Sequence, residues 1–372
     1  MTNDVEKIPT LLAPLIRAAA ADIDAGSDLP ARLRTELREA GAFRMLTPKN
    51  LGGAEAPLTT TMTVYEQLGR LDASVAWVVW NANFGFIGAM MEEAGTARIW
   101  GESEPVFANS GMPGVAVPVE DGYRVSGSWR LVSGVNGADW VIVIAGVVED
   151  GSPRLTEAGT PDVRLFPVRR DQITIKNTWN VNGLRGSGSD DIVVDGAVVA
   201  EALVVRLDRP AVIDRPLYRG FIPALVIPGC TAVVVGLAQT AIDETVKLAT
   251  VKTGMSGSRL AELAHTQSVV ARSQSALDAA RLLLFDTIAN VDSSLRRRAA
   301  MRSAMSHAAQ VVREVLVAMY ELSSSSSLYI GNPIERLFRD GMVTLQHANH
   351  SATLFDAAGR VRFGLDPGVS LF

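Results

Sequence analysis

The hydrophobic positions divide the chain into three stretches with different periods. Between Ile8 and about Glu102, apolar residues recur every three or four positions, which predicts helices. A Pro-Lys-Asn-Leu-Gly-Gly turn at 48–53 interrupts this pattern. Two further helices are expected at 60–71 and 74–91. The second is apolar on almost every side, so we expect it to be buried.

The middle of the chain, from about Pro105 to Arg206, changes to a period of two. Short alternating segments separated by Gly, Pro, Asn and Asp are typical of strands. We expect strands at 123–129, 140–145, 163–166, 173–176 and 192–195. No long helical pattern lies between them, so the sequence favours a small antiparallel sandwich or barrel over a doubly wound parallel sheet.

From about Thr231 onward the helical period returns. Long helices are expected at 231–251, 259–291 and 295–323, and a last one begins after Pro333 and runs to Phe355. The segment 292–294 (Asp-Ser-Ser) offers an N-cap for the third of them. Long helices with short connections are typical of a four-helix bundle.

The predicted fold class is therefore α+β, mostly α, in three domains. These are an N-terminal helical domain at 1–104, a β-sandwich or barrel domain at 105–208 and a C-terminal four-helix bundle at 209–372. At roughly 100–200 residues per domain, a chain of 372 residues allows two or three such units.

Composition and charge narrow the function classes. The chain is 48% hydrophobic and 20% charged, which excludes disorder, and its net charge of −5 gives no reason to expect nucleic acid. The longest apolar run, 221–230, contains two prolines and falls far short of the roughly 20 residues of a membrane helix. The single Cys230 excludes an internal disulfide. Because the N-terminus also lacks a secretory pattern, we expect a cytoplasmic protein.

Few motifs carry chemistry by themselves. The run 183–188 has the order GxxGxG between two strands, so it does not fit a Rossmann loop and is either a tight turn or a ligand-binding loop. Cys230 lies in a proline-flanked apolar run, which predicts an inert core thiol. His347 and His350 lack a Glu or Cys at ligand spacing, so no metal site is expected. The two histidines are either a hydrogen-bonded edge of the bundle or a general acid/base.

Several segments together resemble the acyl-CoA dehydrogenase superfamily, in the right order along nearly the whole chain. They are Gly41–Gly53, Gly127–Gly134 followed by Ala138-Asp139-Trp140, Trp179–Asp195, Gly236–Gln239 and Ile334–Asp340. The resemblance implies the three domains given above, assembled as a homotetramer or homodimer. It also implies a flavin between the β domain and the bundle.

One departure from the dehydrogenases implies a different reaction. The resemblance places their catalytic Glu at Ala348, which cannot accept a proton, and His347 stands one position earlier. A histidine there, with the Trp129…Ser133-Gly134 segment and the short Ser110–Gly114 loop, resembles the two-component flavin monooxygenases. These are similar to dibenzothiophene monooxygenase, the oxygenase component of p-hydroxyphenylacetate hydroxylase and the secosteroid hydroxylases.

This branch implies a reduced-flavin-dependent monooxygenase. A separate flavin reductase supplies the reduced flavin, O2 adds at its C4a carbon to give a hydroperoxide, and one oxygen atom enters a small organic substrate. The dehydrogenase segments that hold the adenylate of FAD correspond to 252–256 and 321–325, where the residues differ. FMN is therefore expected ahead of FAD. The resemblance leaves open whether carbon, nitrogen or sulfur is oxygenated.

The resemblance also assigns site residues. The expected cofactor-binding residues are Asn109, Ser110, Leu131, Ser133, Arg185, Ser187 and Ser189. Ser133 is the candidate for the flavin N5 contact, and Arg185 for the phosphate. His347 is the second catalytic candidate besides Ser133, and it deprotonates a phenol or donates a proton to the leaving oxygen. Read from spacing alone, Ser133 is an ordinary strand hydroxyl and Arg185 a surface ion-pair residue.

Two alternatives remain at this point. The first is a true FAD-dependent acyl-CoA dehydrogenase whose base has moved, with Glu244 on the first bundle helix as the candidate. The second is a catalytically idle helical protein that uses the fold for assembly and takes up no flavin.

Overall fold

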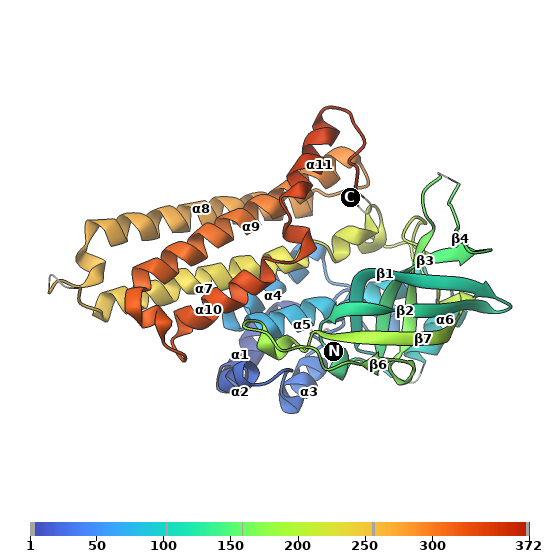
Figure 1. Cartoon of the computed structure of the whole chain (residues 1–372), viewed down its shortest axis with the longest axis horizontal. Coiled ribbons are helices and arrows are strands. Elements are labelled where there is room, and N and C mark those ends of the chain that lie inside the picture. Colours follow the sequence, from blue (N-terminus) through green and yellow to red (C-terminus); the bar gives the residue numbers. More distant parts are fainter. Residues whose placement is uncertain (1–3, 102, 158, 255–256, 370–371) are drawn as a thin grey trace. The chain divides into compact units, whose positions relative to one another are not determined.

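The computed structural model describes residues 4–101, 103–157, 159–254, 257–369 and 372, and the chain forms two compact units (Figure 1). The sheet unit contains the residues up to Pro57, 78–180 and 185–226. The bundle unit contains 58–77, 181–184 and 227–372. Each unit is described by itself below.

The helices of the sheet unit come first in the chain. They are α1 (Ile8–Ala18), α2 (Ala20–Ala25), α3 (Ala31–Glu39) and α6 (Glu93–Trp100), with α5 (Ala73–Ala82) beginning in the bundle unit and ending here. Ile16, Leu33 and Leu37 lie on the buried faces of α1 and α3, as the helical period predicts.

The sheet has the strand order β4-β3-β1-β2-β7-β6 (Figure 1). Strand β5 lies off this path and pairs with β3 over Trp140–Gly146. Its strands are β1 (Phe107–Val119), β2 (Gly122–Val132), β3 (Trp140–Glu149), β4 (Ser152–Pro153), β5 (Val163–Arg169), β6 (Thr174–Ile175) and β7 (Asp190–Ala200). The pairs are antiparallel except β1–β3, which is parallel. The five expected strands are thus present. Trp129 on β2 is fully buried, and its Nε1–H donates to the carbonyl of Ile144 at 3.0 Å.

The expected loop at Ser110–Gly114 is wrong, because this segment lies inside β1. It pairs with β3, and the register shifts between Ser110 and Pro113. Proline and glycine hide the strand signal in the sequence, whereas a bulge lets the strand continue past them.

The bundle unit consists of long helices from distant parts of the chain. They are α4 (Leu58–Leu71), α7 (Gly229–Val251), α8 (Ala264–Ala289), α9 (Leu295–Ser323), α10 (Pro333–Thr344) and α11 (Thr353–Arg362). Helix α9 has the predicted bounds, and the Oγ of Ser294 caps it by accepting from the N–H of Arg297. The apolar stripe of α9, from Met301 to Met319, is buried as expected.

Two expected helices are interrupted. The helix predicted at 74–91 ends at Ala82, where the side chain of Asn83 bonds the carbonyls of Ala42 and Val79. The last helix, predicted to reach Phe355, ends at Thr344 and is followed by the 3-10 turn η12 (Ala348–His350). Side chains that bond nearby backbone groups compete with the helix in both places. His347 and His350 therefore do not lie on one continuous helix.

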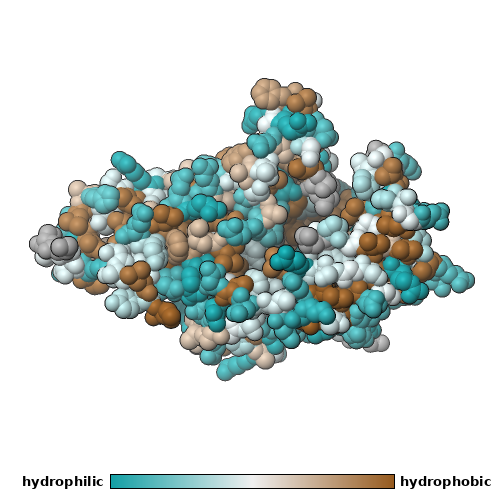
Figure 2. Space-filling model, in the orientation of Figure 1, coloured by the Kyte–Doolittle hydropathy of each residue, from teal (hydrophilic) through white to brown (hydrophobic). Residues whose placement is uncertain are grey.

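Helix α7 is largely buried. The segment Ile222–Val251 is long and apolar enough to cross a membrane by composition, but 78% of its most apolar window is buried inside the protein, as in a core helix. On the face seen in Figure 2, hydrophobic side chains are scattered among hydrophilic ones.

Helices α4 and α7 approach each other backbone to backbone. A Cβ on Gly236 would lie 2.0 Å from the carbonyl oxygen of Glu66, and a Cβ on Gly69 would lie 2.4 Å from that of Val233. Such distances leave no room for a side chain, so these two glycines set the spacing of the helices.

We expect Gly236→Ala to destabilise the protein by about 1–3 kcal/mol, since the new methyl group must push α4 and α7 apart. Urea-induced unfolding measures the loss. Gly359→Ala in α11 is the matched control, because nothing lies within 4 Å of its added Cβ. Alanine also favours a helix, so that variant should be neutral or slightly more stable. Equal stabilities of the two variants would contradict the packing argument.

Candidate functional site

Three serine hydroxyls form a buried chain in the sheet unit. The Oγ of Ser189 lies 2.8 Å from the Oγ of Ser133 and 2.7 Å from that of Ser187. All three residues are at most 4% exposed. Gly134 follows Ser133 in a left-handed conformation and donates its N–H to the carbonyl of Ser187 at 2.8 Å. The structure therefore brings together three of the residues predicted from the sequence.

Leu131 lies at an irregular point of β2. Its φ is 58°, a conformation that is rare outside glycine, and the pairing of β2 with β7 shifts register between Trp129 and Val132. The leucine side chain is 58% exposed. The Oγ of Ser110 donates to the carbonyl of Arg130, the preceding residue, at 3.1 Å. Strained backbone with an exposed apolar side chain is typical of a ligand site.

The other two predicted residues of this unit are held from neighbouring elements. The Nδ2 of Asn109 donates to the backbone and side-chain oxygens of Asn81 at 3.0 and 3.1 Å. The guanidinium of Arg185 donates to the carbonyl of Asp24 at 2.5 Å and to that of Ala25 at 3.4 Å, both in α2. Arg185 is thus a half-buried residue held against a helix end.

The two halves of the glycine-rich run 183–188 have different contacts. Gly183 and Leu184 pack on α10, where a Cβ on Gly183 would lie 2.4 Å from the carbonyl oxygen of Arg339. The Oδ1 of Asp340 accepts the N–H of Leu184 at 2.7 Å. Burial raises the pKa of Asp340 to about 6. The first half of the run is therefore a tight turn, and the second half supplies Ser187 to the hydroxyl chain.

His347 precedes the turn η12 in the bundle unit. Its Nδ1 accepts the backbone N–H of Asn349 at 3.2 Å, which leaves the ring proton on Nε2. Its ring meets that of Trp77 edge-on, with 5.6 Å between the centroids. Burial lowers the pKa of His347 to about 3, and the charges of His350 and Arg302 act in the same direction. His347 is therefore neutral at pH 7.

His350 is fixed at both ring nitrogens. Its Nδ1 lies 3.1 Å from the carbonyl of Thr344, and its Nε2 lies 3.2 Å from the hydroxyl of Thr231. The carbonyl accepts, so Nδ1 carries the proton and Nε2 accepts from Thr231. Burial lowers the pKa of His350 to about 4. Because both nitrogens are engaged inside the protein, His350 holds the turn that carries His347.

Sequence reasoning missed Asn349 and Arg302. Asn349 stands between the two histidines, and Arg302 lies on the expected helix 295–323, four residues after Arg298. Arg302 is 5% exposed, and its Nη1 donates to the Oδ1 of Asn349 at 3.0 Å. The position of Asn349 beside the predicted catalytic residue was an available signal. Nothing in the sequence placed Arg302 there.

The other candidates are not used in this arrangement. Cys230 is buried, and burial raises the pKa of its thiol to about 12, so it is inert as expected. Glu244 is half-buried and forms an ion pair with Lys247 at 2.6 Å. Among the described residues, no group of three His, Cys, Asp or Glu side chains could hold a metal ion.

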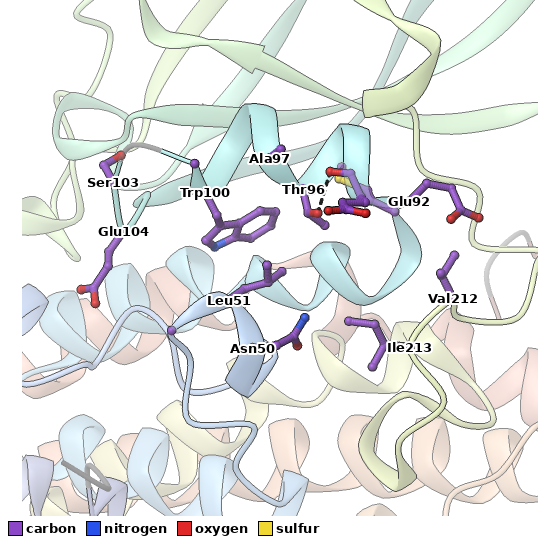
Figure 3. Close-up of a pocket in the computed structure, with 14 residues that line it drawn as sticks. Asn50, Leu51, Glu92, Thr96, Ala97, Trp100, Ser103, Glu104, Val212 and Ile213 are labelled. Carbon is purple, nitrogen blue, oxygen red and sulfur yellow. Dashed lines mark hydrogen bonds between the residues drawn. The ribbon is translucent and has the colours of Figure 1, made fainter.

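The sheet unit also contains an open cleft of about 830 Å³ (Figure 3). The indole of Trp100 lies over Leu51 in this cleft, and Glu92, Thr96 and Asn50 line it. None of its lining residues is a predicted site residue. The cleft is therefore separate from the serine chain and from the Leu131 bulge.

Comparison with known proteins places the chain in a family. Residues 7–99 match the model of the acyl-CoA dehydrogenase N-terminal domain, and 229–352 match that of the C-terminal domain. The indole-3-acetate monooxygenase of Pseudomonas putida is 31% identical over 343 residues, which are 88% of this chain and 85% of the relative. The chain belongs to the flavin-dependent monooxygenase branch of the acyl-CoA dehydrogenase superfamily.

Other relatives agree with this assignment. The flavin-dependent monooxygenase oxygenase subunit HsaA of Rhodococcus jostii is 26% identical over 382 residues, which are 95% of this chain and 97% of the relative. The crystal structure of the HsaA monooxygenase from M. tuberculosis has a TM-score of 0.91 at 25% identity and covers 100% of both chains. The predicted fold and enzyme class, an oxidoreductase of the monooxygenase type, are thus confirmed, and the dehydrogenase alternative is disfavoured.

We expect His350→Gln to reduce the loss of stability in acid. The folded protein keeps His350 neutral down to a pKa of about 4, whereas the unfolded chain takes up the proton near 6.5. Stability is therefore lost as the pH falls below 6.5, by at most about 1.4 kcal/mol per pH unit for one proton. Urea unfolding between pH 5 and 7, at roughly half-unit steps, measures the slope.

His265→Gln is the control for this measurement, because His265 is exposed. It should leave the slope as in the unchanged protein. The pKa of His347 is also lowered in the folded protein, so His347 too reduces stability in acid. In His350→Gln the dependence of stability on pH should therefore be smaller but not zero. A slope that His350→Gln does not alter would contradict the neutral state of His350.

Proposed function

We propose that this protein is the oxygenase component of a two-component system. It takes reduced flavin from a separate reductase and inserts one oxygen atom of O2 into a small aromatic substrate. The observation that carries the proposal is the neutral imidazole of His347, which stands next to Ala348 where the dehydrogenases carry their catalytic carboxylate. The relatives named indole-3-acetate monooxygenase support an aromatic substrate.

The described residues of the sheet unit fit a flavin. An isoalloxazine ring needs apolar surface for its face and polar groups for its edge. Leu131 offers an exposed apolar side chain on a strained bulge, and the serine chain offers buried hydroxyls that can donate or accept. Ser133 would contact N5, the segment around Asn109 and Ser110 would hold the pyrimidine edge, and Arg185 would bind the phosphate.

Reduced flavin, when bound, supplies the electrons that activate O2 for oxygen transfer. The protein's own part is to exclude water and to hold protons at defined atoms. The Ser133 hydroxyl can accept from an N–H because Ser189 can accept its own proton. His347 holds a proton at Nε2 and offers it to an oxygen atom in the site. This supports the donor role of His347 over the role of a base that deprotonates a phenol.

FMN remains the first choice of flavin, with FAD second. The segments that correspond to the adenylate-binding parts of the dehydrogenases contact each other here. The Nζ of Lys252 donates to the carbonyl of Ser323 and to the Oγ of Ser326, both at 2.8 Å. Met255 and Ser256, which belong to the first segment, lie outside the described residues. A lysine engaged in this way supports a flavin without an adenylate.

The assembly and location complete the proposal. A homotetramer or homodimer accords with the resemblance and with the exposed apolar side chains of Leu282 on α8 and Ile330 after α9. The absence of disulfide chemistry in a chain with one cysteine supports a cytoplasmic enzyme.

An anaerobic titration with FMNH2 and FADH2 tests the proposal directly. We expect tight binding of reduced flavin, with FMNH2 bound at least about tenfold more tightly, a difference of about 1.4 kcal/mol. Admission of oxygen with indole-3-acetate as probe should yield an oxygenated product. The same titration of Ser133→Ala should show weaker binding. Bleaching of bound FAD by an acyl-CoA under anaerobic conditions would support the dehydrogenase instead.

His347→Ala tests the assigned proton donor. Oxygenation should fall by about 100-fold while H2O2 release rises, because a positioned proton donor contributes rate factors of that order. Binding of reduced flavin should stay within about twofold of the unchanged protein. His265→Gln is the control, since that exposed histidine lies at the start of α8. An unchanged ratio of product to H2O2 in His347→Ala would remove His347 from the mechanism.

A further inference from the structure

The protonation of the His347 ring depends on Asn349, two positions later. The Nδ1 of His347 accepts the backbone N–H of Asn349, so the direction of that N–H decides which ring nitrogen carries the proton. Only proline would remove this N–H, and proline would also fix φ, so the direction of the N–H is better changed through whatever holds the peptide. The side chain of Asn349 is therefore the place to look for the control of His347.

Asn349 is clamped from two other segments. Its Oδ1 accepts from the Nη1 of Arg302 on α9 at 3.0 Å, and its Nδ2 donates to the carbonyl of Ile227 at 3.3 Å. The amide thus bridges α9 and the residue that lies two positions before α7. Two bonds in opposite directions fix both the position and the rotation of the amide plane.

We propose that Arg302 and Asn349 are positioning residues for His347: they hold the turn η12 so that His347 presents a protonated Nε2. The inference rests on the proposed catalytic role of His347. Neither residue is assigned contact with substrate or flavin, and both act through the imidazole.

The chemistry of Arg302 suits this role. Burying a guanidinium costs free energy unless its donors are used, and a planar fork holds an amide oxygen in a fixed direction better than a flexible ammonium does. Burial lowers the pKa of Arg302 to about 10, so the group stays charged at neutral pH. This positive charge opposes protonation of His347. Arg302 therefore orients the turn and also keeps the ring neutral.

The groups that face His347 within the bundle unit come from several elements. His350 and Arg302 both lower its pKa, the Trp77 ring meets the imidazole at an interplanar angle of 77°, and Arg313 lowers the pKa of His350. The Nδ2 of Asn349 also lies 3.9 Å from the Sγ of Cys230, whose thiol stays neutral. Removal of the Arg302 charge should thus leave His350 as the main charge that opposes protonation of His347.

Two pairs of variants separate orientation from charge. Arg302→Lys keeps the charge and loses the fork, whereas Arg302→Gln loses the charge. Asn349→Ala loses both side-chain bonds, whereas Asn349→Asp adds a carboxylate next to Arg302 and so offsets its charge. Gln310→Ala is the matched control, because Gln310 is an exposed residue of α9 whose Nε2 donates to the Oε1 of Glu314 on the same helix at 3.4 Å.

The first readout is ¹⁵N NMR of histidine-labelled, flavin-free protein, with His347→Gln used to assign the signal. We expect one neutral tautomer, with the proton on Nε2, in the unchanged protein and in Gln310→Ala. Asn349→Ala should show a mixture of tautomers. Arg302→Gln and Asn349→Asp should titrate His347 about one pH unit higher, and Arg302→Lys should not.

The second readout is the ratio of oxygenated product to H2O2 with reduced flavin. We expect Asn349→Ala to lower it about tenfold or more, since small misplacements of a reacting group cost factors of 10–100, with flavin affinity unchanged. Arg302→Lys should retain more of the ratio than Arg302→Gln.

The outcomes distinguish this inference from the function it rests on. An unchanged tautomer and pKa of His347 in folded Asn349→Ala and Arg302→Gln would overturn the positioning role. A raised KM for an anionic substrate in Arg302→Gln, with no NMR change, would also overturn it and make Arg302 a substrate-binding residue. If the NMR changes occur but His347→Ala oxygenates normally, positioning stands and the proposed catalytic role of His347 fails.

Discussion

The short break between α10 and α11 is held by polar side chains that would otherwise be costly to bury. Thr344 accepts from His350, Thr231 donates to His350, and Asn349 bonds both Arg302 and the carbonyl of Ile227. Thr231, Thr344, Arg302 and His350 are at most 8% exposed, so these bonds satisfy buried polar groups. Together they replace the helical hydrogen bonds lost after Thr344, and they leave His347 at the start of a turn rather than on a helix face.

This construction explains how an acyl-CoA dehydrogenase fold can carry a different reaction. A dehydrogenase needs a carboxylate that takes a proton, whereas this chain has an exposed Ala348 and a neutral imidazole beside it. The charge of Arg302 would stabilise a nearby carboxylate but disfavours an imidazolium. The same buried arginine therefore favours a neutral hydrogen-bond donor at His347.

The candidate flavin-binding residues of the sheet unit combine a strained backbone with buried hydroxyl groups. Leu131 adopts a left-handed backbone at a bulge, which places an apolar side chain in the open. The chain of Ser133, Ser189 and Ser187 buries three hydroxyls that satisfy one another. Because a hydroxyl can donate or accept, such a chain can meet the edge of a polar ring without carrying charge into a buried place.

The order of the helices and strands could be predicted from the sequence. Helical periods of three and four residues and the alternation from Tyr123 to Asp195 reflect which face is buried, and that property is local to each segment. The bounds of α9 and its cap at Ser294 were predictable for the same reason. The motifs that carry the family resemblance placed His347 and Ser133 on the list of candidates, and the family itself is confirmed.

Three features depend on long-range contacts instead: the break after Thr344, the strand through Ser110–Gly114 and the role of Gly236. In each case the local signal is overridden by a partner far along the chain: Thr231 for His350, β3 for β1, and Glu66 for Gly236. Arg302 belongs to the same class, since an arginine on a helix looks alike in the sequence whether it faces water or a buried amide. Periodicity indicates which residues are buried, but not which atoms contact each other. The chemistry around His347 depends on those contacts.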